Sequence, residues 1–344
     1  MRGLTRRGER LQERPNLLPT TIGIHPQPVK LQKISILTAG ILSTLLVGNV
    51  HAGLVINATF ASSITGDANA SAIEAGINAA ISRVQNAIAS NVTVNITFQE
   101  GGGLGGSSTY IGSIPYSAYL NALQTQQVIS ANDTKAIASL PAGPNNPVNG
   151  NSDVFLTTPL LRALGFSASV ASDSTITLNT SIMNLSRTGA QNGSFYDLQA
   201  VAAHEIDEVL GIGGPGSALP SLTGAVGVLD LFRYSAAGVR SFTTSSSATS
   251  YFSIDGGVTD IVGFNQAGGG SDYSDWASTG TKRVQDAYGT PGADVDIGSA
   301  ELTALDVVGY DLVPVPEPAS ISIFFAAALG TVGMLTRKRG RAQA

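Results

Sequence analysis

The sequence predicts an α+β fold: the segment pattern points to this class, and length and cysteine content limit how such a fold can be stabilised. Short segments rich in β-branched residues alternate along the chain with longer segments of helical periodicity. The chain has 344 residues, 43% of them hydrophobic, and is therefore long enough to bury a core. It contains no cysteine, so neither disulfides nor thiolate metal sites can contribute to its stability.

The first half of the chain contains two strands around a long helix. Residues 53–61 and 92–99 alternate and carry β-branched side chains, which predicts strands. Between them, 69–90 is rich in alanine, with isoleucines spaced for one face of a helix. Residues 101–106, GGGLGG, predict a flexible loop; they lack the Lys-Ser/Thr ending and the following helix of a phosphate-binding loop. Residues 116–140 are polar and predicted to be helical.

The second half of the chain carries the predicted functional helix. Residues 174–183 alternate and predict a strand, and 194–213 predict a helix. From 214 to 311 the pattern indicates mainly loops and short strands, with a final helix or helix–strand that begins near residue 301. We expect the strands 53–61, 92–99 and 174–183 to share one sheet. The strand 174–183 should be its edge strand, next to the helix 194–213.

The N-terminus has the pattern of a secretory signal peptide. Residues 1–33 carry seven Arg and Lys, an apolar segment follows, and VHAG offers a cleavage site after Ala52. The sequence therefore predicts a signal peptide over residues 1–52. Its basic region is longer than usual, so the true start site is expected further downstream.

The C-terminus has three parts, which together predict where the protein is sorted in the cell. The segment VPVPEPAS, 313–320, precedes 16 uncharged apolar residues, 321–336, and the basic cluster RKRGR, 337–341. An ordinary stop-transfer anchor would have such a span followed by cytoplasmic positive charge. With Pro-Glu-Pro in front of the span, residues 314–344 resemble the PEP-CTERM sorting signal. This resemblance implies processing by an exosortase-type enzyme in a Gram-negative bacterium that makes extracellular polysaccharide.

The part between these ends is strongly acidic. Residues 53–313 carry eight Lys and Arg against 21 Asp and Glu, a formal net charge of −13 (8 minus 21). A surface of this charge repels nucleic acid and argues against DNA or RNA as a partner. It suits an exported protein, located at the cell surface or in the extracellular matrix.

The stretch AAHEIDEVLGIG is one residue away from the zinc-protease helix His-Glu-x-x-His. His204 and Glu208 are four residues apart, so they lie on one face of the helix with the spacing of metal ligands. Glu205 has the position of the general base that activates water. It also falls inside the apolar arc of the helix, where an unpaired charge would be costly. That arc consists of Leu198, Val201, Ala202, Ile206, Val209 and Leu210.

The helix AAHEIDEVLG resembles those of the metzincin-like clan of zinc metalloproteases. With DLFRYS (230–235), YFSIDGG (251–257) and ELTALDVVGYD (301–311), the chain resembles a group of PEP-CTERM-anchored bacterial proteins classed as metalloproteases. The resemblance implies a zincin-like domain over 53–313, in which the edge strand beside the active helix binds the substrate backbone.

The sequence departs from the metzincin pattern in its ligands. The third histidine of that pattern would fall at Gly214, and no Met-turn is present. His204 is the one histidine after the predicted cleavage site, so any zinc site must be completed by oxygen ligands. Asp230 is the expected third ligand, and Tyr234 the residue expected to stabilise a tetrahedral intermediate.

A second set of carboxylates lies in the glycine-rich segments DGGVTD and GGGSDYSDW. Such loops can bind calcium, but turn chemistry explains the same residues, and we favour the latter interpretation. The four residues are Asp255, Asp260, Asp272 and Asp275.

Two functions of different classes fit these features. The first is an exported zinc-dependent peptidase, in which metal-activated water attacks a peptide or protein substrate with Glu205 as base. The alternative is a non-catalytic matrix or adhesion protein that keeps the zincin scaffold. A serine triad is unsupported, because the one available histidine is already assigned and no Gly-x-Ser-x-Gly elbow occurs.

Overall fold

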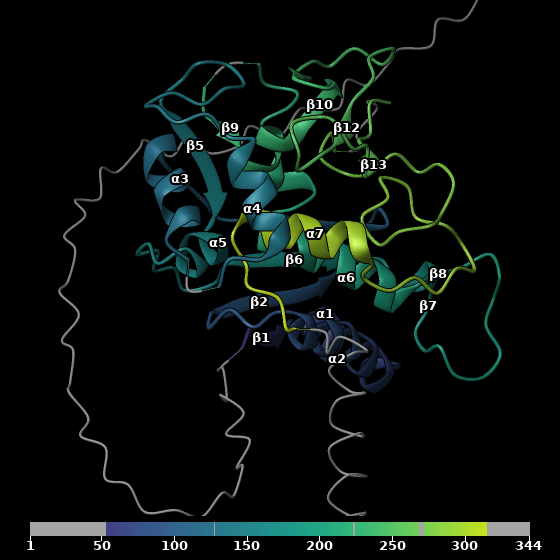
Figure 1. Ribbon diagram of the computed structural model, residues 1–344. Helices are drawn as coiled ribbons and strands as arrows, with labels where there is room; N and C mark the ends of the chain where they lie inside the picture. The colour runs from purple at the N-terminus through teal and green to yellow at the C-terminus, as the bar shows by residue number, and fades with distance from the viewer. Residues whose placement is uncertain (1–52, 127, 223, 268–271, 315–344) are drawn as a thin grey trace, which may run out of the picture. The chain divides into compact units, whose positions relative to one another are not determined.

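The computed structural model describes residues 53–314 apart from 127, 223 and 268–271, and these residues form the expected α+β fold (Figure 1). The predicted signal peptide, 1–52, lies outside the described residues, and so does the predicted sorting tail beyond Pro314. Within the described part of the chain, no helix is long and apolar enough to cross a membrane.

The main sheet has four strands in the order β1-β2-β6-β3. The first three are parallel, and β3 runs antiparallel to β6. Their bounds are β1 Val55–Phe60, β2 Thr93–Glu100, β6 Ser174–Leu178 and β3 Gly105–Thr109. The prediction that 53–61, 92–99 and 174–183 share one sheet is therefore confirmed.

The prediction that 174–183 forms the edge strand was wrong. Strand β6 lies between β2 and β3, and β3 is the edge strand. Its first residues, Gly105 and Gly106, belong to the segment expected to be a flexible loop. Glycine has no side chain with which to show alternation, so pairing with β6 defines this strand rather than its own sequence pattern.

Three smaller sheets complete the strands. One contains β4 (Ile111–Pro115), β5 (Asp153–Thr157) and β9 (Val226–Gly227). Another, antiparallel throughout, contains β10 (Arg233–Ala236), β11 (Val239–Arg240), β12 (Tyr251–Phe252) and β13 (Val262–Gly263). The last pairs β7 (Met183–Asn184) with β8 (Tyr196–Asp197).

The helices that the sequence predicted lie close to their expected positions, and the structure adds two short helices, Ser62–Thr65 and Thr158–Ala163, which the sequence did not predict. Segment 116–140 divides into two helices, because Ser130 and Asp133 form a capping box that starts a new one. The α-helices are α1 Ser62–Thr65, α2 Ala70–Ala87, α3 Tyr116–Gln124, α4 Ala131–Ala138, α5 Thr158–Ala163, α6 Leu198–Leu210 and α7 Ser299–Val308.

Helix α6 is the central helix of this arrangement. It contacts β3 and β6 of the main sheet on one side and α2 on another. All six residues of its predicted apolar arc are buried. Gly76 of α2 permits the close approach of the two helices, since a Cβ there would lie 2.7 Å from a Leu198 methyl carbon. Asp197 caps the helix by accepting hydrogen bonds from the backbone N–H of Gln199 and Ala200.

Helices α4 and α7 are joined through the carboxylate of Asp306 on α7. Asp306 accepts hydrogen bonds from Ser130 Oγ at 2.8 Å and Asn132 Nδ2 at 3.2 Å. Burial, with the nearby charge of Asp133, raises the pKa of Asp306 from 3.8 to about 6. Between pH 3.8 and about pH 6, Asp306 is therefore protonated more often in the native state than in the unfolded state. This contribution to stability is therefore full below 3.8 and is lost as the pH rises through about 6.

We expect Asp306→Asn to remove this pH dependence, because the amide keeps a hydrogen-bonding side chain of similar size but cannot ionise. The free energy of unfolding of the variant, minus that of the wild type, should increase from about pH 4 to about pH 6 and then level off. Urea unfolding of both proteins across that range, with metal removed, measures this difference. A difference that does not vary with pH would contradict the assignment.

Candidate metal centre

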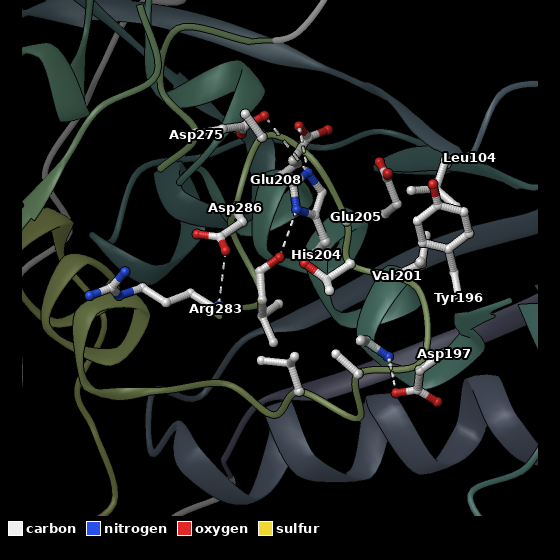
Figure 2. Close-up of a pocket in the computed structure, with 18 of the residues that line it drawn as sticks. Leu104, Tyr196, Asp197, Val201, His204, Glu205, Glu208, Asp275, Arg283 and Asp286 are labelled. Carbon is white, nitrogen blue, oxygen red and sulfur yellow. Dashed lines mark hydrogen bonds and ion pairs between the residues drawn. The ribbon is translucent and has the colours of Figure 1, made fainter. Parts of the chain in front are cut away.

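The imidazole of His204 is held so that one ring nitrogen, Nε2, faces the carboxylates of Glu208 and Asp275. Its Nδ1 lies 2.9 Å from the backbone carbonyl oxygen of Val284 (Figure 2). A carbonyl oxygen only accepts, so Nδ1 carries a proton, and Nε2 is the ring nitrogen that can bind a metal once any proton of its own is displaced. Histidines that bind metals are commonly oriented by such a bond from the second nitrogen.

Glu208 lies one helical turn further along α6, beside His204. Its Oε1 is 3.7 Å from His204 Nε2 and accepts a hydrogen bond from the backbone N–H of Gly214 at 3.1 Å. Its Oε2 accepts from Ser107 Oγ of β3 at 2.7 Å. The edge strand and the turn after α6 therefore fix this carboxylate from two sides.

Asp275 completes the group from a distant loop. Its Oδ2 lies 4.0 Å from His204 Nε2. One donor atom from each of His204, Glu208 and Asp275 lies within 4.8 Å of the other two, so this group can hold a metal ion. Figure 2 shows the three side chains converging.

The charges around this group favour a cation. Burial is the largest cause that raises the pKa of Glu208, and Asp272 raises it further. Burial likewise raises the pKa of Asp275 to about 7. Burial alone would lower the pKa of His204, but the surrounding carboxylates outweigh it and raise that pKa to about 10. Carboxylates crowded around one imidazole form a donor set that a divalent cation would neutralise.

Glu205 lies next to the group without belonging to it. It is 4% exposed, and burial followed by the charge of Glu208 raises its pKa well above the ordinary value. Its Oε2 has no hydrogen-bond partner among the described residues. Its Oε1 lies against β3, because a Cβ on Gly105 would be 2.4 Å from that oxygen. Glu205 therefore has one oxygen free for a ligand or a proton.

These side chains line a pocket with a cavity volume of about 340 Å³. Strand β3 forms one wall, α6 forms another, and the segment 283–295 crosses opposite them. Leu104, Tyr196 and Val201 give the pocket an apolar side, beyond Glu205 (Figure 2). The pocket thus combines a possible metal group, a free carboxylate and an apolar surface.

The structure does not bring Asp230 or Tyr234 into this pocket. Asp230 accepts hydrogen bonds from Ser217 Oγ at 2.5 Å, Ala218 N–H at 2.8 Å and Gly227 N–H at 3.2 Å. Its oxygens are thus committed to a turn. Tyr234 is buried on β10, where the guanidinium carbon of Arg240 lies 4.7 Å from its ring centroid.

The glycine-rich carboxylate set divides in the structure. Asp255 closes its own turn, accepting from Thr259 N–H, Thr259 Oγ1 and Ser253 Oγ. Asp272 and Asp275 instead line the pocket. Among the described residues, His204, Glu208 and Asp275 are the one group found that meets the geometric requirement for a metal. The sequence had shown Asp275, but only as a turn or calcium residue.

Comparisons with known proteins identify no relative: no family model, no curated protein and no solved structure matches this chain. The geometry of the site is therefore the basis on which a function can be inferred.

Adjacent glycines of β3 offer a test of how closely Glu205 packs against this strand. Gly105→Ala would place a methyl group 2.4 Å from Glu205 Oε1 and 2.9 Å from Val201 Cγ1, whereas Gly106→Ala meets nothing within 4 Å. We expect Gly105→Ala to lose about 1–3 kcal/mol of stability through overpacking. Gly106→Ala should change stability by less than about 0.5 kcal/mol. Urea unfolding measures both, and equal stability of the two variants would contradict the described packing.

Proposed function

We propose that this protein is a zinc-dependent peptidase with a zincin-like domain. The observation that carries the proposal is the convergence of His204, Glu208 and Asp275 beside the partly free carboxylate of Glu205, in one pocket. With a histidine, a carboxylate at the fourth following position and an acid between them, one helix can supply two metal ligands and a base for metal-assisted hydrolysis.

His204, Glu208 and Asp275 would hold the zinc ion. Nitrogen and carboxylate oxygen are both common zinc ligands, and the Nδ1 bond to Val284 leaves Nε2 available. Bound zinc would supply Lewis-acid polarisation of a carbonyl group and lower the pKa of a water. A site with one imidazole and two carboxylates should bind zinc less tightly than one with three imidazoles.

Glu205 would act as the general base. Its free Oε2 can accept the proton of the attacking water and later deliver it to the leaving amine. Burial raises its pKa, which makes this carboxylate a stronger base than an exposed one. Tyr234 lies outside the pocket lining, so the roles in catalysis fall to Glu205 and the metal group.

The edge strand supports a peptide as the substrate. Within the described residues, β3 pairs with β6 along one side and has no strand on its other side. An extended peptide could add to that side through backbone hydrogen bonds. Its neighbours in the pocket, Leu104 and Val201, would contact an apolar side chain of the peptide.

We also propose that the protein is exported and sorted to the cell surface or matrix. The signal-peptide pattern over 1–52 and the PEP-CTERM resemblance over 314–344 support this address. An exosortase-type enzyme would be the partner that removes the C-terminal span.

Two substitutions separate the base from the ligands. Glu205→Gln should keep zinc and lower peptide turnover by about 100-fold or more, because it removes a base and not a ligand. Glu208→Ala should lose zinc and turnover together, whereas Glu208→His should keep or strengthen zinc binding, because imidazole is also a zinc ligand. Glu74→Gln makes the same chemical change on α2, outside the pocket, and should leave turnover unchanged.

Zinc content and hydrolysis of a peptide library by purified protein measure these effects. Full turnover by Glu205→Gln would contradict the assigned base. A wild type that binds zinc and cleaves no peptide would favour the alternative, a non-catalytic matrix or adhesion protein on this scaffold.

A further inference from the structure

A buried amide lies directly behind the metal group. Gln285 is fully buried, and its Nε2 lies 3.0 Å from Asp275 Oδ1 and 3.3 Å from His204 Nε2. The same –NH₂ group therefore reaches two of the three side chains that can hold a metal. No sequence pattern drew attention to this residue.

The backbone of Gln285 is fixed on both sides. Its N–H donates to Glu301 Oε1 at 3.2 Å, and its carbonyl oxygen accepts from the N–H of Trp276 at 2.8 Å. Glu301 Oε1 also accepts from Trp276 Nε1 at 3.1 Å. Because Trp276 directly follows Asp275, these bonds also fix the backbone of Gln285 relative to that of Asp275.

The side-chain amide of Gln285 packs against Gly213, in the turn after α6. Gly213 has φ +70°, and a Cβ there would lie 2.1 Å from Gln285 Nε2 and 3.1 Å from Asp275 Oδ1. A residue with a side chain would be strained at this φ and would also displace the amide. Glycine at position 213 is therefore needed for two reasons: it adopts the positive φ of the turn, and it leaves space for the hydrogen bond between Gln285 and Asp275.

The donating end of the amide faces Asp275. A carboxylate oxygen only accepts hydrogen bonds, so an amide oxygen at this place would bring two acceptors together. With –NH₂ there, Oδ1 of Asp275 is occupied, and Oδ2 remains on the side of His204, at 4.0 Å from its Nε2. Partners of this kind orient metal-binding carboxylates and raise metal affinity in other sites.

We propose that Gln285 is a positioning residue of the metal centre, which acts through Asp275 and has its place secured by Gly213. The proposal rests on the proposed function, in that it requires zinc to bind at His204, Glu208 and Asp275. Gln285 fixes the rotamer of Asp275 before the metal arrives, so that less conformational freedom is lost on binding.

A double-mutant cycle tests this role in the purified protein, with the zinc Kd from chelator competition as the readout. Gln285→Met keeps the length of the side chain and removes its donor. We expect it to raise the Kd by about 10- to 100-fold. In an Asp275→Ala background the same change should alter the Kd by less than about threefold, because the residue through which Gln285 acts is absent. If Gln285 contributed only to the stability of the fold, Gln285→Met would raise the zinc Kd by the same factor in both backgrounds.

Gly213→Ala provides a second route to the same contact, without altering either side chain. It should also raise the zinc Kd. Gly256→Ala is its matched control, since Gly256 has φ +76° with nothing within 4 Å of the added Cβ. Gly256→Ala should introduce a similar backbone strain, because its φ is also positive, but should leave the zinc Kd at the wild-type value.

Either of two results would overturn the role of Gln285: an unchanged Kd in Gln285→Met or Gly213→Ala, or equal losses in both backgrounds. These results differ from failure of the proposed function, for which the wild type itself would bind no zinc.

Discussion

Carboxylates lose favourable hydration when they are buried, and this cost constrains the whole centre of the molecule. Helix α6 buries Glu205, Asp207 and Glu208 within a single turn, and Asp275 approaches them from outside. Both oxygens of Asp207 lack a hydrogen-bond partner among the described residues, and burial raises its pKa well above the ordinary value. A helix that served only as core would not carry such a concentration of acids. A cation at His204 is the simplest charge that would balance it.

The surrounding structure positions these acids through uncharged hydrogen-bond donors and close-packed glycines rather than through opposite charge. Ser107 and the N–H of Gly214 hold Glu208, and the bare backbone of Gly105 leaves space for Glu205. Gly76 brings α2 against α6 in the same manner. Small residues at these close approaches let one helix serve both as core and as the floor of a pocket. Any added methyl group there would compete with a side chain of the site.

The periodicity of apolar residues predicted most of the helices and strands, and it gave no information where the sequence is not periodic. The apolar spacing identified α2, α6 and the three parallel strands, and the spacing of four residues paired His204 with Glu208. The edge strand β3 was missed because Gly105 and Gly106 show no alternation. Asp275 and Gln285 come from a long segment of loops, whose path depends on tertiary contacts and not on local pattern. Asp230 was chosen by its distance along the chain, which cannot distinguish a ligand from a carboxylate that closes a turn.

Anomalous diffraction at the zinc edge, from crystals grown with zinc, tests whether His204, Glu208 and Asp275 hold a zinc ion. The account predicts one strong peak bounded by His204 Nε2 and the carboxylates of Glu208 and Asp275, at about 2.0–2.2 Å from each donor atom. Glu205 should lie beside the peak without binding it. A peak beside Asp230, or no peak near His204 in protein saturated with zinc, would contradict it.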